Sequence, residues 1–190
     1  SRRRWQKKVC TISRKYGRIL FTGCPNHPRS VLPPLSAYGE IDMEAQNDFK
    51  ELLALLNAHE VDYIIVGAFA LAHHGAPRYT GDLDILVRPD WENGPRILRA
   101  LDAFGFGSLG LTVEDFAAPG KVVQLGVPPV RVDIVTSITG VSWEEAAAGR
   151  AQGAYGDVSV YFLGREEFLR NKRALGRKKD LADVEAIGEE

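Results

Sequence analysis

The chain has 190 residues, a length that corresponds to one domain. Hydrophobic residues make up 45% and charged residues 26%, as in an ordinary soluble protein. No apolar run approaches the roughly 18 residues that span a bilayer, and the basic first residues have no apolar stretch behind them, unlike a secretory signal. We therefore expect a soluble, cytoplasmic protein with no membrane partner.

Charge is unevenly distributed along the chain. Residues 1–42 contain nine Lys and Arg and only two acidic residues, a net charge of +7, whereas residues 43–190 have a net charge of −8. The only methionine, Met43, lies at this boundary, and residues 1–42 lack hydrophobic periodicity. We predict that residues 1–42 are a disordered or non-native extension and that residues 43–190 form the domain. The alternative is a native basic arm that contacts nucleic acid.

The first half of the predicted domain alternates helical and strand patterns. Apolar residues at helical spacing predict helices, and short apolar runs ending at Gly or Pro predict buried strands. The expected order is helix, strand, short helix, strand and helix, over residues 44–59, 61–66, 68–74, 83–87 and 91–104.

The second half predicts a hairpin, a short helix, a strand and two closing helices. Ser142 and Glu145 form a capping box at the start of the short helix, and residues 157–163 alternate in polarity like a half-exposed strand. The elements are expected at residues 121–125, 130–136, 143–148, 157–163, 165–175 and 178–187. This order predicts a small mixed α/β domain.

Asp82-Leu83-Asp84 is the most informative short motif. Side chains of a strand alternate between its two faces, so Asp82 and Asp84 are expected on one face and Leu83 on the other, in the core. Neighbouring carboxylates repel each other unless a cation accompanies them. Mg²⁺ takes oxygen ligands and often combines one or two carboxylates with substrate phosphates. The motif therefore favours a Mg²⁺ site, with Mn²⁺ as an alternative metal.

Gly67-Ala68 supplies the complementary half of such a site. A strand that ends at a glycine and leads into a helix presents backbone N–H groups at the helix N-terminus, which attracts phosphate. Glycine also allows close approach of the backbone to a ligand. We therefore expect Gly67 and Ala68 to bind nucleotide phosphates.

Asp133 is the candidate for a third metal-binding carboxylate. It stands in the otherwise apolar run 132–135, where an unpaired charge would be costly. Three carboxylates suit two metal ions about 3.5–4 Å apart, one orienting the triphosphate and one activating the attacking hydroxyl. Asp133 would act as the general base or beside it. The alternative is a structural ion pair with Arg131 or Arg78.

The segment VGAFALAHHGAPRYTGDLDILV, followed downstream by VDIV, resembles the DNA polymerase β-type nucleotidyltransferase superfamily. The hallmark of that superfamily is a Gly-Gly or Gly-Ser pair, then Asp-x-Asp, then a third Asp on a neighbouring strand. A closer likeness is to small bacterial nucleotidyltransferase-like proteins related to the toxins of abortive-infection toxin–antitoxin systems. It runs from about Val61 to the C-terminus and rests on His74-Gly75, Pro77-Arg78, Thr80, Asp82 and Asp84.

This resemblance implies a minimal nucleotidyltransferase fold, with C-terminal helices packed beside the sheet. It makes Arg78 and Thr80 candidate nucleotide-binding residues, and the ending NKRALGRKKDLADVEAI extends it to Lys172, which would reach the phosphates. The residues expected to shape the same region are Arg177, Lys179, Asp180 and Asp183. The chain departs from the pattern at Ala68, where a serine hydroxyl is lost and only the backbone N–H remains.

Structural alternatives stand beside several of these interpretations. Asp-x-Asp also occurs in calcium loops, in glycosyltransferases and on solvated strand ends, although the apolar run at residues 85–87 favours a strand over a calcium loop. Arg78 would alternatively pair with Asp82 or Asp84. The basic residues between 172 and 179 would alternatively form a solvated helix face.

Two functions follow from these residues. The first is an enzyme that transfers a nucleoside monophosphate from an NTP to an acceptor hydroxyl on a tRNA, a protein or a small molecule, releasing pyrophosphate. The second is a catalytically weak or inactive nucleotide-binding or partner-binding module of a toxin–antitoxin pair, and Ala68 favours it. A cognate toxin or antitoxin protein is an expected partner in either case.

Overall fold

The computed structural model describes residues 12–15, 18–21, 35–78, 80–127 and 130–188. Their centre is a mixed sheet in the order β1-β2-β5-β6-β4-β3-β8-β7. Its strands are β1 (Ile12–Lys15), β2 (Arg18–Phe21), β3 (Tyr63–Val66), β4 (Asp82–Val87), β5 (Val122–Val127), β6 (Val130–Val135), β7 (Ala151–Tyr155) and β8 (Val158–Phe162). Strands β4 and β6 run parallel at the centre, whereas β3 with β4 and β5 with β6 are antiparallel.

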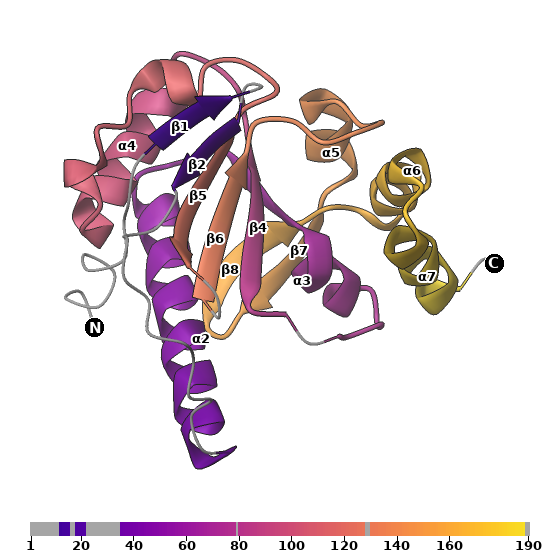
Figure 1. Cartoon of the computed structure of the whole chain (residues 1–190). Helices are drawn as coiled ribbons and strands as arrows, with labels where there is room; N and C mark the ends of the chain where they lie inside the picture. Colours follow the sequence, from indigo (N-terminus) through magenta and orange to yellow (C-terminus); the bar gives the residue numbers. More distant parts are fainter. Residues whose placement is uncertain (1–11, 16–17, 22–34, 79, 128–129, 189–190) are drawn as a thin grey trace.

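The helices flank this sheet (Figure 1). They are α2 (Leu35–Ala58), α3 (Gly67–His73), α4 (Asn93–Phe104), α5 (Trp143–Gly149), α6 (Arg165–Leu175) and α7 (Lys178–Ile187), with the 3₁₀ turns η1 (Gly107–Leu109) and η2 (Val113–Asp115). Helices α2 and α4 pack together, and α6 and α7 form a second pair beside the sheet. The predicted α/β class, with a mixed sheet and C-terminal helices beside it, is confirmed. None of the described helices is both long enough and apolar enough to cross a bilayer.

The core forms where apolar residues of the sheet meet the α2–α4 pair. Leu52 and Leu56 of α2 and Ile97 of α4 are fully buried, as are Ile64 and Ile85 of the sheet. Helical spacing places these leucines on one side of α2, and strand alternation sends every second residue of β4 toward the core. The apolar residues thus fix which face of the sheet is covered and which is free to carry polar groups.

The predicted elements from residue 61 onward all appear, with ends that differ from the prediction by at most two residues. The Ser142–Glu145 capping box is present at the start of α5, with both reciprocal hydrogen bonds. In this part of the chain one strand was not predicted: β7, with the sequence AQGAY, pairs along its length with β8. Its small and polar residues lack apolar alternation, because an edge strand has little contact with the core.

Residues 1–42 are described only in part. Residues 12–15 and 18–21 form a hairpin that continues the sheet beyond β5, and α2 begins at Leu35, so the predicted boundary at residue 42 falls within this helix. Residues 1–11, 16–17 and 22–34 lie outside the described residues. The assignment of residues 1–42 to an extension stays a prediction.

Candidate functional site

The parallel pairing of β4 with β6 builds the acidic centre of the site. Its register sets Asp82 opposite Arg131 and Asp84 opposite Asp133. Because both strands alternate in the same phase, all four side chains lie on one face of the sheet. The residues between them, Leu83 of β4 and Val132 of β6, point to the other face and are almost completely buried. We call the surface formed by these four charged residues the acidic face.

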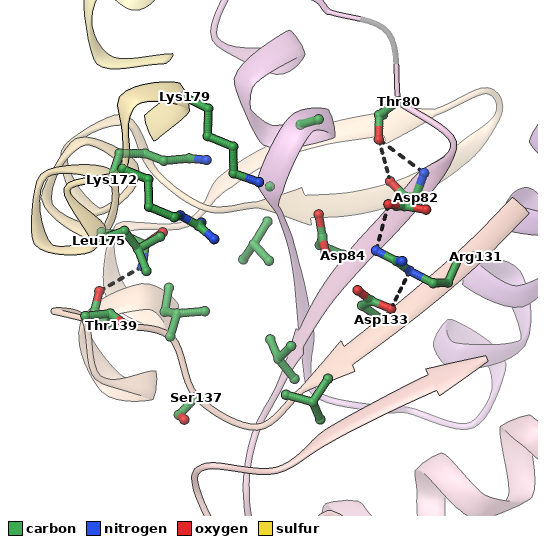
Figure 2. Close-up of a pocket in the computed structure, with 18 of the residues that line it drawn as sticks. Thr80, Asp82, Asp84, Arg131, Asp133, Ser137, Thr139, Lys172, Leu175 and Lys179 are labelled. Atoms are coloured by element: carbon green, nitrogen blue, oxygen red, sulfur yellow. Dashed lines mark hydrogen bonds and ion pairs between the residues drawn. The ribbon is translucent and has the colours of Figure 1, made fainter. Parts of the chain in front are cut away.

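Arg131 links two of the three carboxylates. Its Nη2 donates to Asp82 Oδ2 over 2.7 Å, and its Nε lies 3.0 Å from Asp133 Oδ1. Gln124 of β5 donates a further hydrogen bond to Asp133, over 3.1 Å. Burial raises the pKa of Asp133, although Arg131 and Gln124 act in the opposite direction. Asp133 is therefore held by Gln124 from β5 and by Arg131 from its own strand; Figure 2 shows the contact with Arg131.

Asp84 has a different environment. The structure gives its carboxylate no hydrogen bond and no ion pair with the described residues. Burial, followed by the negative charges of Asp133 and Asp82, raises the pKa of Asp84 to about 6. This carboxylate lies on the pocket side of the sheet and holds unused oxygen acceptors.

Gly67 makes room for Asp84. The glycine has φ +66°, and a Cβ added to it would lie 2.1 Å from Asp84 Oδ2. Any side chain here would meet both the backbone strain of a left-handed conformation and a clash with the carboxylate. The glycine that starts α3 is thus required by two independent features of the site. Ala68, which follows it, is almost completely buried.

A pocket of about 760 Å³ lies over the acidic face. Among the residues that line it are all eight site residues predicted from the sequence: Gly67, Ala68, Arg78, Thr80, Asp82, Asp84, Asp133 and Lys172. The volume falls within the range of about 300–1,000 Å³ that is usual for small-molecule sites. The structure brings these residues together, while their roles in binding and catalysis stay predictions.

The C-terminal helices supply the opposite, cationic wall. Figure 2 shows Lys172 of α6 and Lys179 of α7 extending toward the pocket. Lys172 is buried and lies 3.1 Å from Asp180 Oδ1 and 2.7 Å from Asp183 Oδ2. Arg177 also lines the pocket and bonds to Asp180. Burial raises the pKa of Asp180, but hydrogen bonds from Arg177 and Lys172 outweigh this and hold the pKa below its usual value.

Arg78 and Thr80 connect the two walls. Arg78 Nε donates to Asp183 Oδ1 over 3.1 Å, so the alternative that pairs Arg78 with Asp82 or Asp84 is wrong. Thr80 Oγ1 accepts from the backbone N–H of Asp82 and donates to its carbonyl, over 3.1 and 3.2 Å. Thr80 thus fixes the backbone where β4 begins. For Asp133, the alternative of a pairing with Arg131 is the one observed.

Sequence reasoning missed several polar residues of the pocket. Gln124 carried a usable signal, because it is polar in an otherwise apolar strand, as Asp133 is. Asn171, which donates to the Thr139 carbonyl over 2.8 Å, and Ser137 carried none, because single polar residues in loops and on helices are common. Asn171 and Ser137 line the pocket, and Gln124 bonds to Asp133, which lines it.

The donor chemistry of the acidic face fits a hard divalent cation. Three carboxylates stand on adjacent strands, and Asp84 offers oxygens with no other partner. Within the described part of the chain, however, no three His, Cys, Asp or Glu side chains are grouped as a metal site. Figure 2 shows Arg131 between Asp82 and Asp133. Divalent binding would therefore require this guanidinium to move.

Comparisons with known proteins give weak similarities. No protein-family model matches the chain, and no curated protein matches it significantly. A candidate nucleotidyltransferase from Thermotoga maritima superposes with a TM-score of 0.45 at 15% identity, covering 81% of this chain and 94% of that one. An antigenic nucleotidyltransferase-like protein from Paracoccidioides brasiliensis gives a TM-score of 0.45 at 19% identity, covering 76% and 75%. These values assign no function to the chain, so the pocket itself carries the functional inference.

Proposed function

We propose that this protein transfers a nucleoside monophosphate from an NTP to an acceptor hydroxyl in a reaction that depends on divalent metal. One observation carries the proposal: the in-register pair Asp84 and Asp133, with Asp82 beside it, faces a cationic wall across a pocket of about 760 Å³. Transfer from a triphosphate requires both the carboxylates and the cationic wall. Positive charge neutralises the phosphates, and the carboxylates serve the activation of the hydroxyl that attacks the phosphorus.

The three carboxylates would hold two Mg²⁺ ions, or Mn²⁺ in their place. When bound, such ions neutralise phosphate charge and lower the pKa of a hydroxyl that they contact. Lys172, Arg177 and Lys179 supply fixed positive charge on the opposite wall. Gly67 and Ala68 present backbone N–H groups at the start of α3, although this helix has only seven residues.

The covalent step is a single displacement at the α-phosphorus of the NTP. The acceptor oxygen forms the new P–O bond, the bond between the α-phosphorus and its bridging oxygen breaks, and pyrophosphate leaves. The proton of the acceptor hydroxyl passes to the Asp133 carboxylate. Burial raises the pKa of Asp133, which makes this carboxylate a stronger proton acceptor than an ordinary aspartate, and Gln124 donates a hydrogen bond that orients its oxygens.

The resemblance noted from the sequence extends the proposal to biological context. It favours a role in a toxin–antitoxin system, with a cognate toxin or antitoxin as partner. The acceptor would be a tRNA, a protein or a small molecule. The net charge of −8 over residues 43–190 weighs against a large nucleic-acid footprint.

The second candidate is a nucleotide-binding or partner-binding module with little turnover. Ala68 favours it, because the alanine offers no hydroxyl to a phosphate or a metal. The pairing of Lys172 with two buried carboxylates points the same way, since this lysine must leave or share them to reach a phosphate. The two candidates differ in whether Asp84→Asn abolishes the biological effect.

The test is Mg²⁺-dependent binding and turnover of the four α-labelled NTPs by the full chain. We expect one NTP to bind only with Mg²⁺, and Asp84→Asn to lower product formation by about 100-fold or more. Asp157→Asn is the matched control, because Asp157 is 75% exposed and forms an ion pair with Lys50 on the surface. Binding without turnover would favour the second candidate. Absence of metal-dependent binding by folded protein would contradict the first candidate and leave only the partner-binding form of the second.

A further inference from the structure

The acidic face carries its own cation. Arg131 is the only positively charged side chain of the described residues within ion-pair distance of Asp82 or Asp133. The β4–β6 register fixes it there, because Arg131 stands directly opposite Asp82 and two residues before Asp133 on the same face. A guanidinium is a planar fork of donors that can engage two carboxylates at once.

The two contacts of Arg131 are unequal. Its Nη2 makes an aligned hydrogen bond to Asp82 over 2.7 Å. Its Nε is buried and has no aligned hydrogen bond, although Asp133 Oδ1 lies 3.0 Å away. The contact with Asp133 is therefore mainly electrostatic. One guanidinium also cannot balance three carboxylates, and Asp84 has no hydrogen bond or ion pair with the residues that the structure describes.

We propose that Arg131 is a displaceable internal cation, which occupies the position between Asp82 and Asp133 in the absence of metal and sets the metal affinity of the site. The inference rests on the proposed function. A divalent ion carries twice the charge and is able to engage all three carboxylates, but it competes with Arg131 for two of them. Arg131 thus keeps the metal-free acidic face folded and weakens the binding of metal alone.

The displaced guanidinium has a natural new partner. The Arg131 side chain is 29% exposed and lines the pocket, so it reaches the space proposed for the polyphosphate. Bidentate contacts with phosphate oxygens would replace the lost contacts with Asp82 and Asp133. Metal and nucleotide would then bind cooperatively, because the nucleotide stabilises the arginine that the metal displaces.

The experiment compares Mn²⁺ affinity in wild type, Arg131→Gln and Asp84→Asn, with and without a non-hydrolysable NTP analogue. Titration calorimetry gives the affinities, and thermal unfolding with a chelator reports the metal-free stability. In Arg131→Gln, we expect Mn²⁺ alone to bind about tenfold more tightly and the cooperativity with nucleotide to be reduced. The melting temperature of this variant should fall with chelator and recover with Mn²⁺.

Arg88→Gln is the matched control. Arg88 lies 2.7 Å from Asp90 and 3.6 Å from Asp62, so it also links two aspartates, beyond the opposite end of β4. Its substitution should leave Mn²⁺ affinity unchanged. If Arg131→Gln does not fold, Arg131→Lys replaces it. A lysine keeps the positive charge but cannot contact both carboxylates as the planar guanidinium does, so Mn²⁺ affinity should rise by about threefold.

The outcomes separate this inference from the proposed function. Mn²⁺ affinity that stays equal or falls in the Arg131 variants, while Asp84→Asn still abolishes binding, overturns the role of Arg131 and leaves the proposed function standing. No Asp84-dependent Mn²⁺ binding in any variant overturns both. Tighter binding in the Arg131 variants alone supports the displaceable cation.

Discussion

The two faces of β4 and β6 are made by alternate residues of the same strands, and they obey opposite rules. On the core face, Leu83 and Ile134 are almost completely buried and complement their neighbours in shape. On the acidic face, burial and, to a smaller extent, neighbouring negative charge raise the pKa values of Asp84 and Asp133. Apolar packing on the core face stabilises the folded state, whereas the buried carboxylates of the acidic face destabilise it. An acidic cluster that costs free energy, set on a rigid and well-packed sheet, is typical of a functional site.

The largest effect is expected from a change on the core face. Leu83→Ala should lower the free energy of unfolding by about 2–5 kcal/mol, because it removes a buried side chain and leaves a cavity. Urea denaturation measures this loss. Leu181→Ala is the control, since Leu181 is 45% exposed and its truncation should cost less than about 0.5 kcal/mol. Equal losses in both variants would contradict the contrast between the two faces.

A change on the acidic face should have the opposite sign. In a chelator at pH 7.5, Asp84→Asn should raise the free energy of unfolding by up to about 3 kcal/mol, since each pKa unit corresponds to ~1.4 kcal/mol. The pKa of Asp84 rises from 3.8 to about 6 on folding, so the folded state binds the extra proton between these values. The wild type therefore loses stability as pH rises from about 4 to about 6, and below pH 4 the two proteins should converge.

The measurement is urea denaturation of wild type and Asp84→Asn across pH 3.5–8. Asp157→Asn serves again as control, with no gain at pH 7.5, because the pKa of Asp157 is lowered by its hydrogen bond from Lys50. If the wild type is more stable than Asp84→Asn at pH 7.5 without metal, the ionised Asp84 carboxylate does not destabilise the folded state, and the prediction is wrong.

The smallest effect is expected at Ala68, beside the acidic face. Ala68→Ser restores the hydroxyl typical of the family that the sequence resembles. One added hydrogen bond to a phosphate should tighten NTP binding by about 2- to 10-fold, corresponding to ~0.5–1.5 kcal/mol. Fluorescence titration with a labelled NTP measures the change, and Ala72→Ser, later in the same helix, is the control. Unchanged or weaker binding would mean that position 68 does not face the phosphates.

Most of the fold was predictable because its signals are local. Strand alternation predicted that Asp82 and Asp84 share one face of β4. Asp133 was identified because it is a charged residue within an otherwise apolar strand. The capping box of Ser142 and Glu145 fixed the start of α5. The edge strand β7 was missed because its AQGAY sequence meets little of the core and carries no periodic signal.

The partners within the site were not predictable, because they depend on register and on contacts distant in sequence. Arg131 faces Asp82 only through the parallel β4–β6 pairing, which no local pattern specifies. Arg78 meets Asp183 across a separation of 105 residues. The sequence therefore indicated the acidic side chains of the pocket and Arg131 as one alternative partner of Asp133, but not the contact of Arg131 with Asp82.

The in-phase register of β4 and β6 also limits which changes in chain length the protein can tolerate. Deleting one residue between Arg131 and Asp133 would turn every later side chain of β6 to the opposite face, placing a carboxylate in the core and an isoleucine in the pocket. A deletion of two residues would preserve the faces and remove the opposition of Asp84 and Asp133. The centre of this sheet should thus accept substitutions far more readily than insertions or deletions, so relatives should differ here in residue type but not in length.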